Sequence, residues 1–326
     1  MKQIKAWAAR LGLAGAVFCL SIQAFAQGYP NRPVKLLIPY AAGGAVDIMG
    51  RIIAKELGEL NNQAYVVENK GGAGGAIAAA EVAHAPPDGY EILIGATGQI
   101  SIAPAVYGTS VGFNPTKDLV PISLIATTPY VLVTNTALPV KSVAELIAYA
   151  KSKPGKMNYA SAGTGGPDHL AGELFQSMAG LSVQHVPYKG SGPALNDVMA
   201  GQVQYQFVSP LPAMPLVESG KLRLLAVTTK DRSHAMPDVP TVAESVPGFE
   251  VAPWYGLFVP TGTPPAIIAK ISADIRNVIA RDAVQEALRK RGLDPVTNTP
   301  QEFAAFLQSD VAKWAQVVKD AGVKVE

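Results

Sequence analysis

A glycine-rich run at residues 159–170, Tyr-Ala-Ser-Ala-Gly-Thr-Gly-Gly-Pro-Asp-His-Leu, is the segment of this chain best suited to binding chemistry. It follows a short apolar stretch and leads into a helical pattern, so the unpaired N–H groups of the new helix point back at the turn. Glycines let backbone approach a ligand closely, and hydroxyls add further donors. We predict an anion site here, contributed by Ser161, Ala162, Gly163, Thr164, Gly165 and, in the following turn, His169.

A second turn of the same kind spans residues 39–47, Pro-Tyr-Ala-Ala-Gly-Gly-Ala-Val-Asp, 120 residues earlier. It directly follows an apolar run at 34–38, and α/β sheets bind ligands at the carboxyl ends of their strands. Two such turns facing one another would clamp a single anion. Asp47 either caps the helix that follows or finds a partner when the clamp closes. The residues predicted for this half are Tyr40, Ala41, Ala42, Gly43, Gly44 and Asp47.

Two more strand-to-helix turns carry polar side chains that suit the same ligand. The first offers a hydroxyl and an amide, although a plain loop fits the residues as well. The second offers hydroxyls and a lysine, which is either a ligand contact or a solvated side chain. The predicted contributors are Ala96, Thr97, Gly98, Gln99, Tyr188, Lys189 and Ser191. With Tyr40 and Tyr188, Phe207 leaves room for an aromatic or apolar ligand body.

The common catalytic and cofactor motifs are missing from the sequence. No Gly-x-Ser-x-Gly elbow or His-Glu-x-x-His pair occurs, and the four histidines are isolated. The run Gly71–Gly75 resembles a dinucleotide turn, but Ile77 occupies its third glycine position and no suitably placed acid follows, so we interpret it as a turn for close helix–sheet packing. We expect no cofactor and no metal.

The N-terminal residues 1–26 have the pattern of a secretory signal: a basic start, the apolar core 11–20 and an Ala-Phe-Ala end. Removing them also removes Cys19, the single cysteine, so the mature chain has no disulfide or thiolate site. It also removes three cations from a formal net charge of +2, which leaves −1. We expect a periplasmic protein that binds no nucleic acid and, after the signal, has no run long enough to span a membrane.

The rest of the chain alternates short apolar runs with helical patterns, which favours parallel sheets covered by helices on both faces. A β-α-β-α-β order ends near residue 95 and a second unit of the same plan fills the middle of the chain. The runs 119–133 and 249–260 pass between the two units, and the C-terminal part is helical. We therefore predict lobe 1 from 27–127 and 253–326, and lobe 2 from 128–252.

Taken in order, several segments resemble the tripartite tricarboxylate transporter substrate-binding proteins, also called the Bug or TctC-like family. The resemblance implies a type II periplasmic binding protein fold, with two α/β lobes, two crossing hinge strands and a carboxylate in the cleft. This chain departs from the family pattern at Ala45, Gln204 and Phe207, near the far end of the ligand. The matching segments are 39–47, 69–75, 87–90, 159–165, 186–191, 222–228, 237–244 and 254–257.

These observations predict a monomeric receptor that makes and breaks no bond. It would close on a small organic carboxylate and deliver it to integral-membrane transporter subunits. Two alternatives stay open at this point. One is an exported α/β hydrolase-like enzyme that uses Ser161 or Ser191 with His169; the other is a sensory module that presents the same ligand to a membrane partner.

Overall fold

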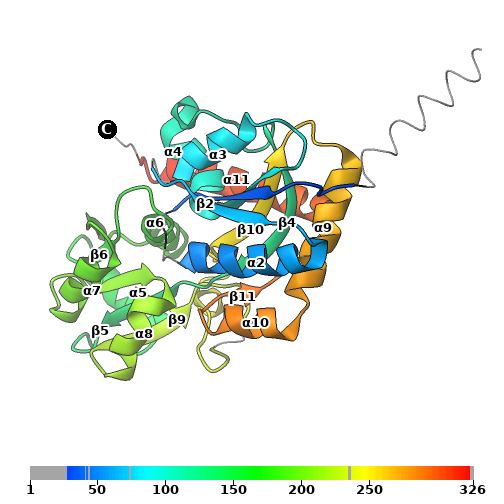
Figure 1. Cartoon of the computed structure of the whole chain (residues 1–326). Coiled ribbons are helices and arrows are strands. Elements are labelled where there is room, and N and C mark those ends of the chain that lie inside the picture. Colours follow the sequence, from blue (N-terminus) through cyan, green and yellow to red (C-terminus); the bar gives the residue numbers. More distant parts are fainter. Residues whose placement is uncertain (1–27, 41, 43–44, 73–74, 234–235, 324–326) are drawn as a thin grey trace, which may run out of the picture.

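The computed structural model describes residues 28–40, 42, 45–72, 75–233 and 236–323 (Figure 1). The predicted signal peptide and the turn residues Ala41, Gly43 and Gly44 lie outside the described residues. The described chain forms two α/β lobes, with lobe 2 in green on the left of Figure 1 and lobe 1 on the right. Each lobe has its own sheet, so the two-lobe α/β architecture predicted from the alternating pattern is confirmed.

Lobe 1 contains a six-stranded sheet in the order β11-β4-β10-β3-β1-β2. Strand β1 pairs in parallel with both β2 and β3, whereas β10 runs antiparallel to β3 and β4. The carboxyl ends of the parallel strands and the start of β10 therefore meet at one edge. The strands are β1 Val34–Ile38, β2 Tyr65–Asn69, β3 Glu91–Ala96, β4 Leu119–Thr127, β10 Trp254–Pro260 and β11 Asp294–Pro295.

Lobe 2 contains a five-stranded sheet in the order β7-β6-β8-β5-β9. Strand β6 is parallel to β7 and β8, while β5 is antiparallel to β8 and β9. The start of β5 thus lies at the edge where β6 and β8 end. The strands are β5 Val131–Asn135, β6 Asn158–Ser161, β7 Gln184–Pro187, β8 Tyr205–Val208 and β9 Leu222–Val227.

Helices cover both faces of each sheet because alternate strand residues point to opposite faces and both sets are apolar. In lobe 1, α2, α9 and α10 bury one face, and α3, η2 and α11 bury the other. In lobe 2, α5 and α6 cover one face and α7 and α8 the other. The helices are α2 Ala45–Asn61, α3 Ala76–Ala83, α4 Ala103–Tyr107, α5 Val143–Ser152, α6 Pro167–Ala179, α7 Ser191–Met199, α8 Pro210–Glu218, α9 Pro265–Ile279, α10 Asp282–Arg289 and α11 Pro300–Asp320, with short turns η2 Gly98–Ile102, η3 Gly108–Val111 and η4 Val242–Glu244.

Helix α11 contributes to the cores of both lobes. It begins with a capping box, in which Thr299 and Glu302 each bond to the other's backbone N–H. Its first half buries Phe303 beside β10, whereas Trp314 in its second half lies in the lobe 2 core with α6. The lobes are therefore joined on this side by one helix that packs in both cores.

Two short segments cross between the sheets, one leading from β4 to β5 and the other leading into β10. They are joined by the Thr128 N–H, which donates to Pro253 O at 2.8 Å. On the lobe 2 side, the Thr228 N–H donates to Tyr130 O at 2.9 Å, and the Thr228 hydroxyl contacts Val251 O. These bonds make the crossing segments a narrow two-stranded hinge.

The apolar run at 34–38 forms a strand with these bounds, and the C-terminal part is helical as predicted. Helix α8 was not predicted, because its sequence Pro-Leu-Pro-Ala-Met-Pro-Leu-Val-Glu holds three prolines. Pro210 and Pro212 lie in the first turn, where a helix has no internal acceptor for an N–H, so only Pro215 removes a helical bond.

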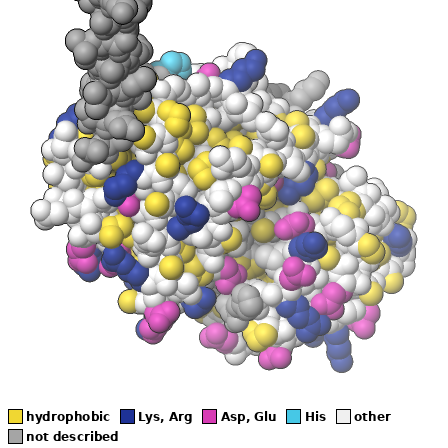
Figure 2. Space-filling model, turned by 90° about the vertical axis from the view of Figure 1, so that its right-hand side faces the viewer, with side chains coloured by type: hydrophobic (Ala, Val, Ile, Leu, Met, Phe, Trp, Pro, Cys, Tyr) yellow, Lys and Arg dark blue, Asp and Glu magenta, His cyan; other side chains and the backbone are white. Residues whose placement is uncertain are grey.

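On the face of the molecule shown in Figure 2, basic and acidic side chains are interspersed.

Candidate functional site

The turns that follow β1, β3, β6 and β7 lie at the carboxyl edges of the two sheets, where the lobes face one another across the hinge (Figure 1). Gly98 of lobe 1 and Pro167 of lobe 2, the first residue of α6, lie close to one another. A Cβ built on Gly98 would be 4.0 Å from the Pro167 ring. The structure therefore brings the turns at 96–99 and 161–167 together across the cleft.

The first turn of lobe 1 is held by a polar network on its outer side. Asn69 at the end of β2 donates its amide to Tyr40 O at 3.0 Å. Arg51 on α2 donates to the Asn69 amide oxygen at 3.1 Å and to Asp47 at 3.0 Å. Asp47 is 3% exposed and its carboxylate is balanced by the Arg51 guanidinium, so this turn carries no net side-chain charge.

Gln99 aims the hydroxyl of Tyr40. The Gln99 side chain is fully buried and lies 2.9 Å from the Tyr40 hydroxyl. Neighbouring donors and acceptors favour the amide orientation in which its nitrogen donates to Tyr40 Oη and Ala96 O, while its oxygen accepts from the Ala96 N–H. In that arrangement the Tyr40 proton remains available to an acceptor in the cleft. Burial raises the pKa of Tyr40, which keeps this proton in place at neutral pH.

Thr97, by contrast, faces the protein. Its hydroxyl oxygen accepts the Trp254 N–H at 2.8 Å, and the side chain is 2% exposed. Trp254 in turn donates its indole N–H to Asp310 on α11 at 2.8 Å. Thr97 therefore fastens the end of β3 to the start of β10 and to α11, rather than offering a donor to the cleft.

In the glycine turn of lobe 2, backbone N–H groups donate to side chains of the turn and of the helix that follows it. The Ala162 N–H donates to the Asp168 carboxylate, which also accepts from the N–H groups at the start of α6. The Gly163 N–H donates to Ser161 Oγ at 3.2 Å, and the Gly165 N–H donates to His169 Nδ1 at 3.0 Å. Of the residues predicted for this turn, only Thr164 is exposed.

Among the described residues, no lysine or arginine forms an ion pair with Asp168. Its carboxyl is 6% exposed, and burial raises its pKa. The turn after β6 therefore contains an internal anion, and that anion already takes up donors predicted for a ligand.

His169 lies behind the turn in a stack of rings. Its ring lies 3.9 Å from that of His185, centroid to centroid, and the His185 Nε2 lies 2.7 Å from Ser161 Oγ. Burial lowers the pKa of His169 to about 4 and that of His185 to about 3. Both rings are therefore neutral at neutral pH. They support the turn from below and add no positive charge to the cleft.

The segment after β7 is only partly directed at the cleft. The Tyr188 hydroxyl donates to Asp197 at 2.6 Å, which occupies its proton. Lys189 is exposed, and Ser191 is half-buried at the start of α7. Phe207, which was expected to leave room for a ligand, packs in the lobe 2 core between Phe175 and Phe249, so that expectation is wrong.

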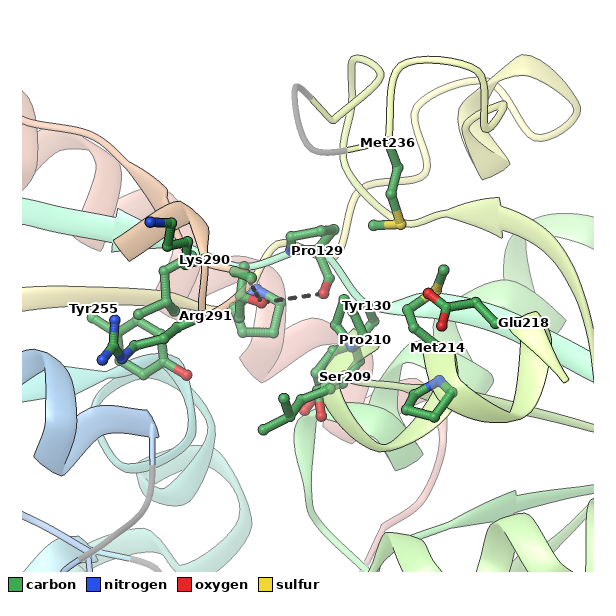
Figure 3. Close-up of a pocket in the computed structure, with 16 residues that line it drawn as sticks. Pro129, Tyr130, Ser209, Pro210, Met214, Glu218, Met236, Tyr255, Lys290 and Arg291 are labelled. Carbon is green, nitrogen blue, oxygen red and sulfur yellow. Dashed lines mark hydrogen bonds between the residues drawn. The ribbon is translucent and has the colours of Figure 1, made fainter. Parts of the chain in front are cut away.

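A cavity of about 540 Å³ opens between the lobes beside these turns (Figure 3). Tyr255 and Arg291 line it from lobe 1, Ser209 and Met214 line it from lobe 2, and Tyr130 lies between them on the hinge. None of the described turn residues predicted from the sequence lines this cavity. It adjoins the predicted turns through the hinge tyrosines, because Tyr130 lies near enough to Asp168, Tyr255 and Tyr40 for their charges to help raise its pKa.

The hydroxyls of Tyr130 and Tyr255 form no hydrogen bond with the described part of the chain. Burial raises the pKa of Tyr255 to about 12, and burial together with the nearby Asp168 raises that of Tyr130 well above its usual value. Both are thus neutral O–H groups whose protons no described residue accepts. Sequence reasoning missed them because it interpreted the runs 119–133 and 249–260 only as passages between the two units; their position in these passages was the available signal.

The geometry around Ser161 departs from that of an activated serine. Its hydroxyl is fully buried and donates to Gly163 O at 2.9 Å, and the histidine beside it is His185 rather than His169. Within the described ranges, no cluster of three or more His, Cys, Asp or Glu side chains is placed to hold a metal ion. The same part of the chain contains no helix that is long and apolar enough to cross a membrane.

Several known proteins are similar to this chain in sequence and in architecture. Residues 49–323 match the family model described as tripartite tricarboxylate transporter family receptor. The chain is 36% identical over 321 residues to Protein BugT of Bordetella pertussis, and the match covers 97% of each. The structure of R. palustris Rpa4515 with adipate is 37% identical, with a TM-score of 0.76, and covers 91% of this chain and 99% of its own. The structure of MatC (Rpa3494) from Rhodopseudomonas palustris with bound malate is 33% identical, with a TM-score of 0.72; the match covers 89% of this chain and 100% of the MatC chain.

These matches confirm the resemblance drawn from the ordered turn motifs, and the shared fold extends over both lobes. They also agree with the two-sheet arrangement, in which the ligand-side edges face one another across a hinge. The chain belongs to the tripartite tricarboxylate transporter family of receptors.

Proposed function

We propose that this protein is an extracytoplasmic receptor that captures a small organic carboxylate between its lobes. It then delivers the ligand to the membrane subunits of a tripartite tricarboxylate-type transporter. Family membership supports the receptor role, and the adipate and malate held by two similar proteins support a carboxylate as ligand. A signal sequence at residues 1–26 supports delivery to the periplasm.

The observation that carries the proposal is the pair of unpartnered phenols at the hinge. Tyr130 and Tyr255 present neutral donors beside a cavity, and Gln99 leaves the Tyr40 proton available. A carboxylate accepts such donors in charge-assisted bonds, each worth about 1.5–3 kcal/mol. Three of them supply roughly 5–9 kcal/mol in gross terms, which is enough for a dissociation constant in the micromolar to millimolar range.

Capture is coupled to the hinge because these donors belong to different parts of the molecule. Tyr40 and Tyr255 belong to lobe 1, in the turn after β1 and at the start of β10, whereas Tyr130 lies on the crossing segment that leads into β5 of lobe 2. A ligand that bonds to all of them favours the conformation in which they converge. The transporter would then recognise the liganded arrangement of the lobes rather than the ligand itself.

Thermal denaturation tests the proposal with benzoate, hexanoate, adipate and malate as probes, and with glucose and Mg²⁺ as controls. A carboxylate at 100 times its dissociation constant should raise the stability by about 2.7 kcal/mol. If every carboxylate leaves the melting temperature unchanged while glucose or Mg²⁺ raises it, the proposal is wrong. Hydrolysis of a nitrophenyl ester that is lost in Ser161→Ala would instead favour the hydrolase alternative.

A further inference from the structure

The cavity beside the hinge tyrosines has mostly apolar walls. Pro210, Leu211 and Met214 on α8 line its lobe 2 side together with Met236, and Pro129 and Pro253 line its floor on the hinge. Figure 3 shows Met214 beside Tyr130 and Glu218, on the opposite side of the cavity from Tyr255, with Met236 above them. Methionine side chains adapt to ligands of different outline, and prolines add no N–H donor that a bound polar group would need.

Leu211 is left uncovered at this wall. It is 71% exposed, which makes it the most exposed of the large hydrophobic side chains in the described part of the chain. It lies in the first turn of α8, directly after the end of β8, on the ligand edge of lobe 2. An apolar group placed in the cavity would remove Leu211 from water, which is favourable in proportion to the area covered.

The charged groups around the cavity do not suit a second ligand carboxylate. Lys290 pairs with Glu286 on its own helix at 2.7 Å, and Arg291 donates to Ala287 O at 2.6 Å. On the opposite wall, Glu218 is exposed and forms no ion pair with the described residues. A ligand whose far end carried a second negative charge would therefore face Glu218, and of the two cations only Arg291, whose guanidinium donates to a backbone oxygen, would stand near to balance it.

We infer that the cavity takes the apolar body of a monocarboxylate, whose single carboxylate is held by the hinge tyrosines. This rests on the proposed function and narrows its ligand class. The volume of about 540 Å³ is within the range of pockets that enclose ligands considerably larger than a four-carbon acid. The ligand is therefore a medium-chain or aromatic acid, unlike the dicarboxylates bound by the two similar proteins.

Calorimetric titration of the exported protein with acetate, butyrate and hexanoate tests the apolar wall. Affinity should rise about fourfold per added methylene, which is 0.8 kcal/mol converted at 1.4 kcal/mol per tenfold. Adipate matches hexanoate in length but adds a far carboxylate, and it should bind at least about tenfold more weakly. A flat series, or adipate binding more tightly than hexanoate, would overturn the inference while leaving the receptor role intact. Failure of every acid to bind would contradict the proposed function instead.

Variants of the walls separate the two contributions. Leu211→Asn and Met214→Gln are expected to flatten the chain-length series by reducing the gain per methylene at least twofold. Glu218→Gln should raise the ratio of adipate to hexanoate affinity several-fold, because it removes the opposing charge. Glu59→Gln removes an exposed carboxylate, paired with Lys55, from the far end of α2; it is the control for the change in net charge and should leave that ratio unchanged. If Arg291→Gln abolishes binding of adipate while hexanoate never binds, the cavity serves a dicarboxylate and the inference fails.

Discussion

The two lobes each place an aspartate in the first turn of a helix that follows a glycine turn, but they balance it differently. In lobe 1, Asp47 is paired with Arg51 at 2.9 Å, and the guanidinium reaches solvent. In lobe 2, Asp168 is buried among backbone N–H groups and has no cationic partner in the described structure. We expect from this difference that the ligand carboxylate is held by lobe 1 and the hinge, because the donors of the lobe 2 turn are already taken up within it.

The largest expected effect comes from removing the internal anion of lobe 2. Asp168→Ala leaves buried N–H groups of the turn and of α6 without an acceptor, which should lower the free energy of unfolding by about 2–3 kcal/mol. Arg51→Gln, which breaks a half-exposed pair in lobe 1, should cost about 1 kcal/mol or less. Urea denaturation measures both. Equal losses from the two variants would erase the proposed difference between the lobes.

His169 tests whether the lobe 2 turn is supported from within. His169→Leu removes the acceptor of the Gly165 N–H and should destabilise the protein by about 1–3 kcal/mol. His169→Asn keeps an acceptor near the position of Nδ1 and should recover much of that loss. A residue that contacted the ligand directly would instead lose affinity in both variants while stability stayed near that of the wild type.

The pH dependence of stability should follow the two neutral histidines. Their pKa values of about 4 and about 3 lie below the unfolded value of about 6.5, so the unfolded chain binds more protons and stability falls as the pH drops below about 6.5. Asp168 and Glu173 oppose this, since burial raises their pKa values and protonation favours the folded state. Between pH 7 and pH 5, we expect the melting temperature of the His185→Asn variant to fall by less than that of the wild type. An equal or larger loss would contradict this role.

A smaller effect is expected from a substitution that takes the cationic partner away from the aspartate of lobe 1, which makes its turn resemble that of lobe 2. Arg51→Gln removes the guanidinium that pairs with Asp47, and the added negative charge near Tyr40 should weaken carboxylate binding by about three- to tenfold. Lys55→Gln removes the same charge from a neighbouring turn of α2, where the lysine pairs with Glu59 instead. Calorimetry should show no comparable loss in this control, and an equal loss would indicate a general effect of net charge.

The arrangement of the two sheets could be predicted because short apolar runs and turn residues alternate regularly, and the ligand edge follows from that order. Helix α8 could not be predicted, because three prolines disfavour a helix. Two of them are tolerated only because they lie in its first turn. The crossing of α11 between the lobes was also missed, since a single apolar stripe does not reveal that it packs against two different cores.

Within the site, sequence patterns identified the turns but not which of their groups are available to a ligand. Glycines and hydroxyls at 161–165 indicate donors, yet Asp168, His169 and Ser161 occupy them through contacts that depend on side-chain direction. Thr97 likewise faces the backbone of Trp254. Conversely, no pattern at Tyr130 or Tyr255 indicates a ligand donor, although Tyr255 lies in the family-matching segment 254–257, and only the hinge geometry brings both to one cavity.

The most direct test of this division between the lobes compares three tyrosine-to-phenylalanine changes by calorimetry, with the carboxylate that gives the largest thermal shift as ligand. Tyr130→Phe and Tyr255→Phe should each weaken binding by about 10- to 100-fold, the loss of one charge-assisted bond, with little change in stability. Tyr188→Phe should bind within about twofold of the wild type, because that hydroxyl donates to Asp197. Normal binding by both hinge variants together with a large loss in Tyr188→Phe would contradict the account.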